Sequence, residues 1–293
     1  MLPGMRDRPR VTIVGAGNLG AVLAMSLHRA GYVIDQIVFR NNRASRRKAT
    51  ALAKRVEARA VDIAIAAIDA EIVWLCVPDD AIERVARSLA QKAEWKGRVA
   101  LHSSGALASD ELAALRGRGA EVASVHPMMT FVAGSRQVGS QLLLAGVPFA
   151  IEGDAAAVRV GRAIVKKLGG KSYAIRQQNK VTYHAWGTFA SPLLTALLAT
   201  TEHVAVAAGV NRREAKQRML PILQQTLANY AALDAAASFS GPIVRGDVET
   251  IRRHLRVLRK VPAAEQVYAA LAMAAVRYLP GKRKRQVRGL LNE

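Results

Sequence analysis

The segment VTIVGAGNLG, near the start of this chain, limits its fold more than any other stretch does. An apolar run of this kind predicts a buried strand, and the helical pattern after it predicts a helix that begins within the glycines. Gly15 would allow the tight turn, Gly17 would let a pyrophosphate approach the backbone, and Gly20 would let the helix pack closely on the strand. Asn18 and Leu19 would present the free N–H groups of the helix N-terminus to the phosphates. We therefore predict a dinucleotide-binding turn; the alternative is a structural strand–helix turn without a ligand.

The rest of the first half alternates short apolar runs with longer helical patterns, which predicts a doubly wound parallel sheet of the α/β class. The predicted strands lie at residues 11–14, 37–39, 72–77, 99–102 and 122–125, with two edge strands near 148–152 and 171–175. After about residue 176 the strand-like runs give way to long Ala/Leu patterns. We therefore expect two domains, 1–176 and 177–293, the second of them all-helical.

The residues after the second predicted strand bear on the choice of nicotinamide nucleotide. An NAD site usually places an acidic residue there to bind the ribose 2′-hydroxyl, but no acid occurs between Asp35 and Glu57. Instead the chain has Arg40, Asn41 and Arg43, and guanidinium groups bind phosphate in a bidentate manner. This favours NADP(H); the alternative is a solvated, basic helix start that binds nothing.

Polar residues also follow the later predicted strands, and ligands of open α/β sheets lie at the carboxyl ends of the strands. Val77 and Pro78 end one strand, and we assign them to the cofactor site. Ser103 ends the next strand, where it would orient a substrate or, alternatively, only cap a helix. His126 ends another strand, as a proton carrier or as a loop histidine that binds backbone.

The first long pattern of the helical domain carries a polar stripe. Lys180, His184, Thr188 and Ser191 are spaced four, four and three residues apart, so one helix face would present all of them. A lysine and a histidine one turn apart suit the reduction of a carbonyl or imine, because one can polarise the oxygen or nitrogen while the other passes the proton. The alternative is that both side chains only satisfy hydrogen bonds between the domains.

Composition excludes several other classes of protein. The net charge of +21 comes from 43 basic and 22 acidic side chains and first suggests nucleic acid, but both halves of the chain are basic. We do not favour a nucleic-acid partner, and we expect the basic tail at 282–288 to be frayed and solvated. The alternative is a nucleic-acid binder that uses this tail, which would bind DNA with a steep dependence on salt. One cysteine, Cys76, fits a reducing, cytoplasmic location. The histidines show no metal-ligand spacing, and the apolar stretch 191–210 is interrupted by a glutamate and a histidine, so neither a metal nor a membrane is expected.

Several motifs, in this order, closely resemble a bacterial family that joins a Rossmann-like domain to a helical domain of unknown function: VTIVGAGNLG, VPDDAI, HSSGALASDEL, SVHPMMTF, FAIEGD, NKVTYHA and SGPIVRGD. The resemblance covers about residues 9–280 and implies an NADP-dependent oxidoreductase related to the ketopantoate reductase, pyrroline-carboxylate reductase and hydroxyacid dehydrogenase group. Lys180 matches the lysine of the K-x-x-x-N motif of the hydroxyacid dehydrogenases, whereas His184 stands in place of its asparagine. The HPM segment at His126 is similar to that of the prephenate dehydrogenases, whose histidine contacts the hydroxyl that is oxidised.

These observations predict an NADP(H)-dependent oxidoreductase that moves a hydride to or from a small carbonyl, hydroxyl or imine substrate carrying a carboxylate. The active site would lie in the cleft between the domains, with Lys180, His184, His126 and Ser103 as catalytic candidates. Helical second domains in the related group commonly dimerise, so the resemblance implies a homodimer. The alternative function is a catalytically silent NADP-binding sensor.

Overall fold

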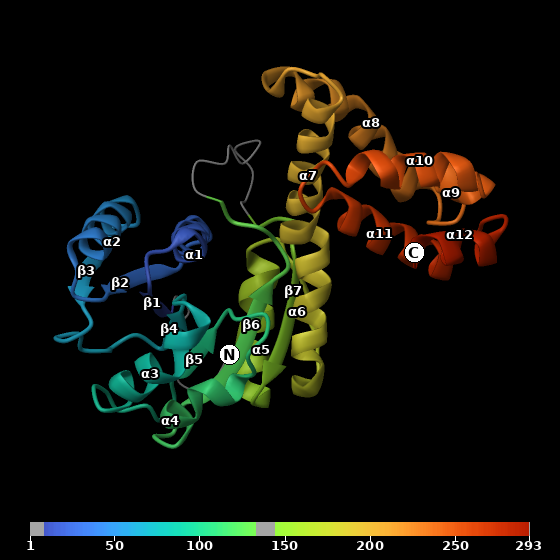
Figure 1. Ribbon diagram of the computed structural model, residues 1–293. Coiled ribbons are helices and arrows are strands. Elements are labelled where there is room, and N and C mark those ends of the chain that lie inside the picture. The colour runs from blue at the N-terminus through green and yellow to red at the C-terminus, as the bar shows by residue number, and fades with distance from the viewer. Residues whose placement is uncertain (1–8, 133–143, 293) are drawn as a thin grey trace. The chain divides into compact units, whose positions relative to one another are not determined.

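Eight strands form one sheet in the order β3-β2-β1-β4-β5-β6-β7-β8 (Figure 1). The computed structural model describes residues 9–132 and 144–292. Neighbouring strands are parallel except β6 and β7, which are antiparallel. The strands are β1 (Arg10–Val14), β2 (Val33–Phe39), β3 (Arg59–Asp62), β4 (Ile72–Leu75), β5 (Val99–His102), β6 (Glu121–Pro127), β7 (Pro148–Gly153) and β8 (Lys171–Ala174). The strand order reverses direction between β1 and β4, the place where ligands of such sheets bind.

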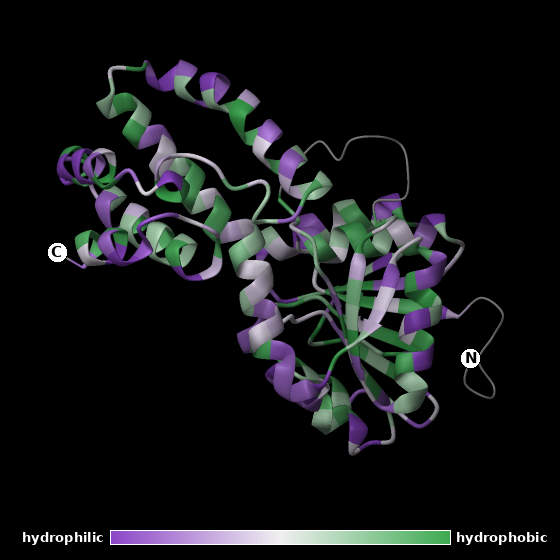
Figure 2. Cartoon of the chain, turned by 90° about the vertical axis from the view of Figure 1, so that its right-hand side faces the viewer, coloured by the Kyte–Doolittle hydropathy of each residue, from purple (hydrophilic) through white to green (hydrophobic). Residues whose placement is uncertain are grey.

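Both faces of this sheet are covered, as the near-continuous apolar runs require. On β4, Ile72 and Trp74 enter one core cluster, and Val73 and Leu75 enter the other. Figure 2 shows the strands largely in the hydrophobic colour. The covering and connecting helices are α1 (Asn18–Arg29), α2 (Arg43–Arg55), α3 (Asp79–Ala90), the 3₁₀ helix η1 (Ser109–Leu112), α4 (Ala113–Arg116), α5 (Ala155–Lys167), the 3₁₀ helix η2 (Gln177–Asn179) and α6 (Lys180–Thr188). The predicted α/β fold class is confirmed.

The chain divides into two compact units between Thr188 and Phe189. We predicted the domain boundary after residue 176, which lies before α6, whereas the observed division lies after it. Helix α6 and its polar side chains therefore belong to the first unit. The second unit is helical, as predicted. Its elements are the π-helical segment η3 (Phe189–Leu193), α7 (Leu194–Ala207), α8 (Arg212–Ala232), α9 (Pro242–Arg245), α10 (Val248–Leu258), α11 (Ala264–Tyr278) and α12 (Lys284–Leu291).

The expectation of a frayed tail is wrong. Residues from Lys284 onward form helix α12, and its side chains Val287 and Leu290 are buried in a cluster with Ile251 and Leu255 of α10. The apolar residues of this short helix fall three residues apart within a strongly basic sequence, and a basic sequence alone suggests solvation. Packing against α10 and α11 is what orders the segment.

A continuous helical stretch, Gln177–Ala207, contains η2, α6, η3 and α7. By length and composition alone it could cross a membrane, and it is the one such helix in the described part of the chain. That is weak evidence, because helices of soluble proteins pass the same test. Pro192 lies in the π-helical turn, where the missing N–H of proline breaks the regular hydrogen-bond ladder.

Candidate active site

The glycine-rich turn lies where β1 meets β4 and has the shape that a dinucleotide requires. Gly15 has φ of +108°, and a Cβ at this position would lie 2.5 Å from the carbonyl oxygen of Cys76. A Cβ on Gly20 would lie 2.0 Å from the Gly15 carbonyl oxygen, so only glycine lets helix α1 approach this closely. A Cβ on Gly17, by contrast, would meet nothing within 4 Å, which leaves the backbone open to a phosphate group. Helix α1 begins at Asn18 with its first N–H groups beside this opening.

Two neighbours of the turn complete this part of the site. The side-chain amide of Asn18 donates to the carbonyl oxygen of Phe131 at 2.9 Å, so the loop after β6 is tied to the glycine-rich turn. Val77 is within reach of the turn, because one of its methyl groups would lie 3.3 Å from a Cβ on Gly15. Pro78 is exposed and forms the N-cap of α3. The structure therefore places Val77 beside the predicted cofactor turn.

Basic side chains gather just after β2, as expected. Arg40, Asn41 and Arg43 are exposed between the end of β2 and the first turn of α2. The neighbouring Asn42 caps α2 by accepting from the Ser45 N–H at 2.8 Å, so its side chain is already occupied. Asp35 lies near the amino end of β2 and pairs with Arg59 at 3.1 Å, away from this edge.

One acidic residue near this edge was not singled out from the sequence. Asp62 ends β3 and is in register with Phe39, the last residue of β2. One of its oxygens accepts from the Ala64 N–H at 2.9 Å. Its proximity follows only from the pairing of β3, a short strand that the apolar-run criterion missed because its sequence is RAVD.

The turn after β5 is fixed by side chains that point in several directions. The Ser103 hydroxyl accepts from the buried indole N–H of Trp74 at 2.8 Å, so this candidate already has a partner in the core. The Ser104 hydroxyl donates to the carboxylate of Asp79 at 2.8 Å and accepts from the Leu107 N–H at 2.9 Å. His102 accepts from the Ser104 N–H through Nδ1 at 3.1 Å. These bonds hold the turn in a single conformation.

Lys180 lies directly behind this turn. Its side chain is 1% exposed, and its ammonium donates to the Ser104 carbonyl oxygen at 3.0 Å and to the Ser124 hydroxyl at 2.6 Å. Burial lowers the pKa of Lys180 from 10.5 to about 8, although Glu152 and Asp79 act in the opposite direction. In this arrangement Lys180 supports the turn from within the protein.

Three aromatic side chains meet beside Gly105, in the turn after β5. The ring of His126 makes edge-to-face contacts with Tyr183 at 5.7 Å and with His184 at 6.1 Å between centroids. Gly105 lies against both histidines, because a Cβ there would be 2.6 Å from the His184 ring and 2.8 Å from Nε2 of His126. His184 is exposed, whereas His126 is half-buried. The predicted candidates Lys180, His184 and His126 thus gather around one turn.

His102 and His126 are neutral at pH 7. Burial, and then the charge of Lys180, lower the pKa of His102 to about 4, and the same causes together with His184 lower the pKa of His126 to about 4. His102 donates through Nε2 to the Ala108 carbonyl oxygen at 3.0 Å, which suits the neutral ring. Nδ1 of His126 is buried and has no hydrogen-bond partner among the described residues. His126 is therefore neutral, and the charged form of its ring is disfavoured where it lies.

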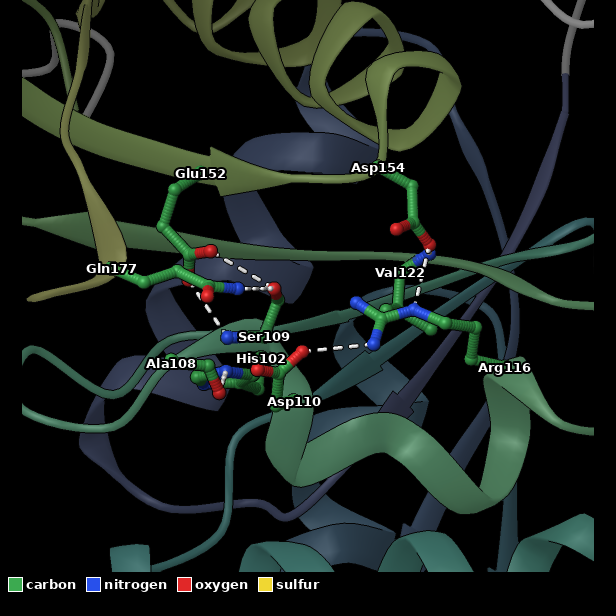
Figure 3. A network of polar contacts seen from close by, with 9 residues as sticks. All are labelled: His102, Ala108, Ser109, Asp110, Arg116, Val122, Glu152, Asp154 and Gln177. Atoms are coloured by element: carbon green, nitrogen blue, oxygen red, sulfur yellow. Dashed lines mark hydrogen bonds and ion pairs between the residues drawn. The ribbon is translucent and has the colours of Figure 1, made fainter.

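A second polar network anchors the surrounding elements (Figure 3). The carboxylate of Glu152 on β7 accepts from the Ser109 N–H at 2.7 Å and from its hydroxyl at 2.9 Å, and Gln177 donates to the same hydroxyl at 3.2 Å. Glu152 is buried, and its negative charge raises the pKa of the nearby Lys180. The network thus joins β7, η1 and the start of the helix that carries Lys180.

The remaining stripe residues do not join the cluster. The Thr188 hydroxyl donates to the backbone carbonyl of His184 at 3.0 Å, and Ser191 lies in the π-helical segment beyond the unit boundary. Sequence reasoning also missed Ser124 and Tyr183. A signal for Ser124 did exist: it lies two residues before His126 on β6, so both polar side chains share one face of a strand that is otherwise buried and mainly apolar. Within residues 9–132 and 144–292, no group of three or more His, Cys, Asp or Glu side chains could hold a metal ion.

The arrangement is that of a Rossmann-like sheet followed by a helical unit, and comparison with known families agrees. Residues 4–127 match the family of Rossmann-like domains, and residues 147–275 match a domain of unknown function, DUF2520. The chain is therefore similar to a Rossmann-like domain followed by a DUF2520 domain, which confirms the resemblance seen in the sequence. No curated protein matches the chain.

Solved structures share the fold over almost the full length. A candidate NADP oxidoreductase from Bacteroides fragilis has a TM-score of 0.75 at 23% identity, covering 91% of this chain and 97% of its own. A reductive aminase from Aspergillus terreus, solved with NADPH and ethyl-5-oxohexanoate, has a TM-score of 0.64 at 16% identity, covering 96% of this chain and 99% of its own. An imine reductase variant from Myxococcus stipitatus, solved with NAD⁺, has a TM-score of 0.60 at 18% identity, covering 98% and 100%. The fold is thus shared with named NAD(P)-dependent oxidoreductases.

Proposed function

We propose that this protein is an NADP(H)-dependent oxidoreductase that acts on a small carbonyl, hydroxyl or imine substrate carrying a carboxylate. The observation that carries the proposal is the gathering of Lys180, His126 and His184 around the turn at Gly105, at the carboxyl ends of β5 and β6. The glycine-rich turn opens at the carboxyl end of β1 in the same sheet. A bound nicotinamide nucleotide would supply the hydride in a reduction or accept it in an oxidation, and the protein would correspondingly supply or take up the proton.

The geometry supports distinct roles for the candidates. His184 is exposed, so it can reach the oxygen or nitrogen of a substrate and exchange a proton with it. His126 lies against His184 and is neutral, so it can hydrogen-bond to a substrate hydroxyl and relay a proton without retaining it. Lys180 is enclosed by its partners, and we assign it to positioning the turn and keeping this region positive, which favours a carboxylate. Ser103 would orient the substrate through its remaining hydroxyl proton.

The preference for NADP(H) rests on Arg40, Asn41 and Arg43, because the fold itself also occurs with bound NAD⁺. We expect Arg40→Ala combined with Arg43→Ala to raise the Kd for NADPH about tenfold or more, since hydrogen bonds to charged groups contribute about 1.5–3 kcal/mol. The Kd for NADH should hardly change. Arg55→Ala is the matched control, because it removes a charge from the opposite end of the same helix, about 18 Å away. Equal loss of both nucleotides would show that the 2′-phosphate binds elsewhere.

Turnover is tested by following NADPH absorbance with a 2-oxo acid, a cyclic imine carboxylate, and a ketone with an amine. We expect oxidation with at least one of them, and we expect His184→Ala to lower kcat while the Kd for NADPH is unchanged. NADPH binding without turnover of any of these substrates would favour the alternative, a catalytically silent NADP sensor. Full activity of His184→Ala would remove His184 from the mechanism.

We also propose that the protein is a homodimer. None of the residues of α7 is buried, although most of them are apolar, and Leu220, Ile222 and Leu227 of α8 are exposed as well. A helix that is apolar all round is normally covered, and large apolar patches mark interfaces between proteins. A second copy of the chain is the partner that the family resemblance implies.

A further inference from the structure

The last four helices carry a concentration of positive charge that the proposed reaction does not use. Residues 242–292 contain twelve Lys and Arg side chains and three acidic ones. The other described residues contain 28 basic and 17 acidic side chains, a far more even balance. The segment also holds more arginine than lysine, nine against three. The 51 residues of this segment thus carry a net charge of +9, against +11 for all the other described residues together, so positive charge is densest here.

The few acids of this segment neutralise only part of the charge. Asp247 pairs with Arg245 at 2.9 Å, and Glu265 pairs with Arg259 at 2.8 Å. Glu249 serves two arginines of α10, at 3.6 and 3.2 Å. Arg277 lies over the ring of Tyr278. The other seven cations of the segment form no ion pair within the described residues: Arg256, Lys260, Lys282, Arg283, Lys284, Arg285 and Arg288. These seven cations are available to an external anion.

The cations are fixed on a folded surface. Helix α12 packs Val287 and Leu290 into the cluster that α10 and α11 form. The Lys282 N–H donates to the Val244 carbonyl oxygen at 2.9 Å, which ties the start of the tail to α9. Gly246 has φ of +70°, and a Cβ there would lie 2.6 Å from the Lys282 carbonyl oxygen. The break in the helical pattern at this glycine thus lets the basic tail dock.

The exposed faces of two neighbouring helices are basic. On α12, Arg285 and Arg288 are three residues apart and exposed, while the apolar side chains of the helix point into the cluster. On α10, Arg252 and Arg256 share the exposed face and are followed by Arg259 at the C-cap, while Ile251 and Leu255 are buried. Because α10 and α12 pack in the same cluster, their basic faces belong to one subdomain.

We propose that the exposed basic faces of α10 and α12 bind the phosphodiester backbone of a nucleic acid without reading its bases. Guanidinium forks match phosphate oxygens, and a row of fixed cations releases counterions from a polyanion on binding. An anionic membrane is the less suitable partner, because a membrane-binding helix inserts its apolar face into the lipid. In α12 that face, with Val287 and Leu290, is already buried. The proposal is independent of the oxidoreductase function.

The test measures fluorescence anisotropy of a labelled duplex DNA of mixed sequence, and of a single-stranded RNA, with the full-length protein between 50 and 200 mM salt. Non-specific binding predicts a Kd of about 10⁻⁴–10⁻⁶ M near physiological salt, and affinity that falls steeply as salt rises. Arg285→Gln combined with Arg288→Gln should weaken binding about tenfold and lower the slope of log K against log salt by about 2. Binding of only one of the two nucleic acids would identify which of them supplies the backbone.

The matched control combines Lys54→Gln with Arg55→Gln, which removes two positive charges from the last turn of α2. This control should bind nearly as well as the wild type. An equal loss in both double variants would overturn the proposal, because net charge alone would then explain binding. Absence of binding at 50 mM salt, or binding to vesicles rich in anionic lipid but to neither nucleic acid, would overturn it too. Unchanged NADPH binding by the Arg285/Arg288 variant shows that the chain remains folded.

Discussion

Replacing Lys180 with methionine tests the electrostatics of the candidate site directly. The ammonium is buried behind the turn after β5, and burial lowers its pKa from 10.5 to about 8. Between these two values the unfolded chain holds a proton that the folded chain has released. Stability must therefore rise with pH across this window. A shift of about 2.5 pH units corresponds to about 3 kcal/mol, so the folded protein carries a cost of about that size at pH 7 that disappears near pH 10.5.

The assay is urea unfolding between pH 7 and pH 10, followed by tryptophan fluorescence. Trp74 and Trp95 are fully buried in the first unit and report its unfolding. The difference in unfolding free energy between wild type and Lys180→Met isolates the lysine, because all other titrating groups are shared. At pH 7 the variant also leaves the Ser104 carbonyl and the Ser124 hydroxyl without their donor, so its stability there reflects two opposing effects. The pH dependence is the decisive quantity.

We expect the wild type to gain up to about 3 kcal/mol relative to Lys180→Met as the pH rises from 7 to 10. Lys180→Arg is a useful second variant, because it keeps a charge that does not titrate in this range. It should lack the rise as well. A constant difference between wild type and both variants over the whole range would refute the reasoning, since the lysine would then have an ordinary pKa.

Two further predictions concern acid stability and assembly. Burial lowers the pKa of His102 from 6.5 to about 4, so the unfolding free energy should fall by up to about 3 kcal/mol as the pH drops from 6.5 to 4, and His102→Gln should remove that part of the fall in urea titrations. If the unfolding free energy of His102→Gln fell as steeply between pH 6.5 and 4 as that of the wild type, the lowered pKa of His102 would not be the cause. Ile222→Asp combined with Leu227→Asp should reduce the mass measured by sedimentation equilibrium from twice 31.5 kDa to 31.5 kDa, because both side chains are exposed on α8. A wild-type protein that already sediments as a single copy would remove the proposed dimer.

The apolar runs in the sequence were sufficient to predict the positions of most strands of the sheet. The run at Val99–His102 is a strand with the predicted bounds, and the two edge strands after residue 147 are present. The short strand β3 was missed because RAVD has no apolar run, and it is held in place by pairing with β2. Helix α12 was missed for a related reason. It buries only two side chains, and what stabilises the helix is their packing in a tertiary cluster that the local sequence does not reveal.

The candidate site was predictable only in part. Helical spacing correctly placed Lys180 and His184 one turn apart, and strand ends brought His126 to the same place. Spacing could not reveal that the lysine is buried, because its enclosure depends on the turn at Ser104 and on Ser124 of a different strand. Burial of a polar group is a property of the assembled neighbourhood, and no local pattern encodes it.

The π-helical turn at Phe189–Leu193 limits how far the polar stripe of the sequence can extend. The stripe was inferred from a spacing of four, four and three residues, which holds only while the helix keeps about 3.6 residues per turn. Lys180, His184 and Thr188 lie in regular α-helix, whereas Ser191 lies within a π turn, which holds one residue more. The helical spacing therefore stops being a guide to the helix face at the first residue after Thr188.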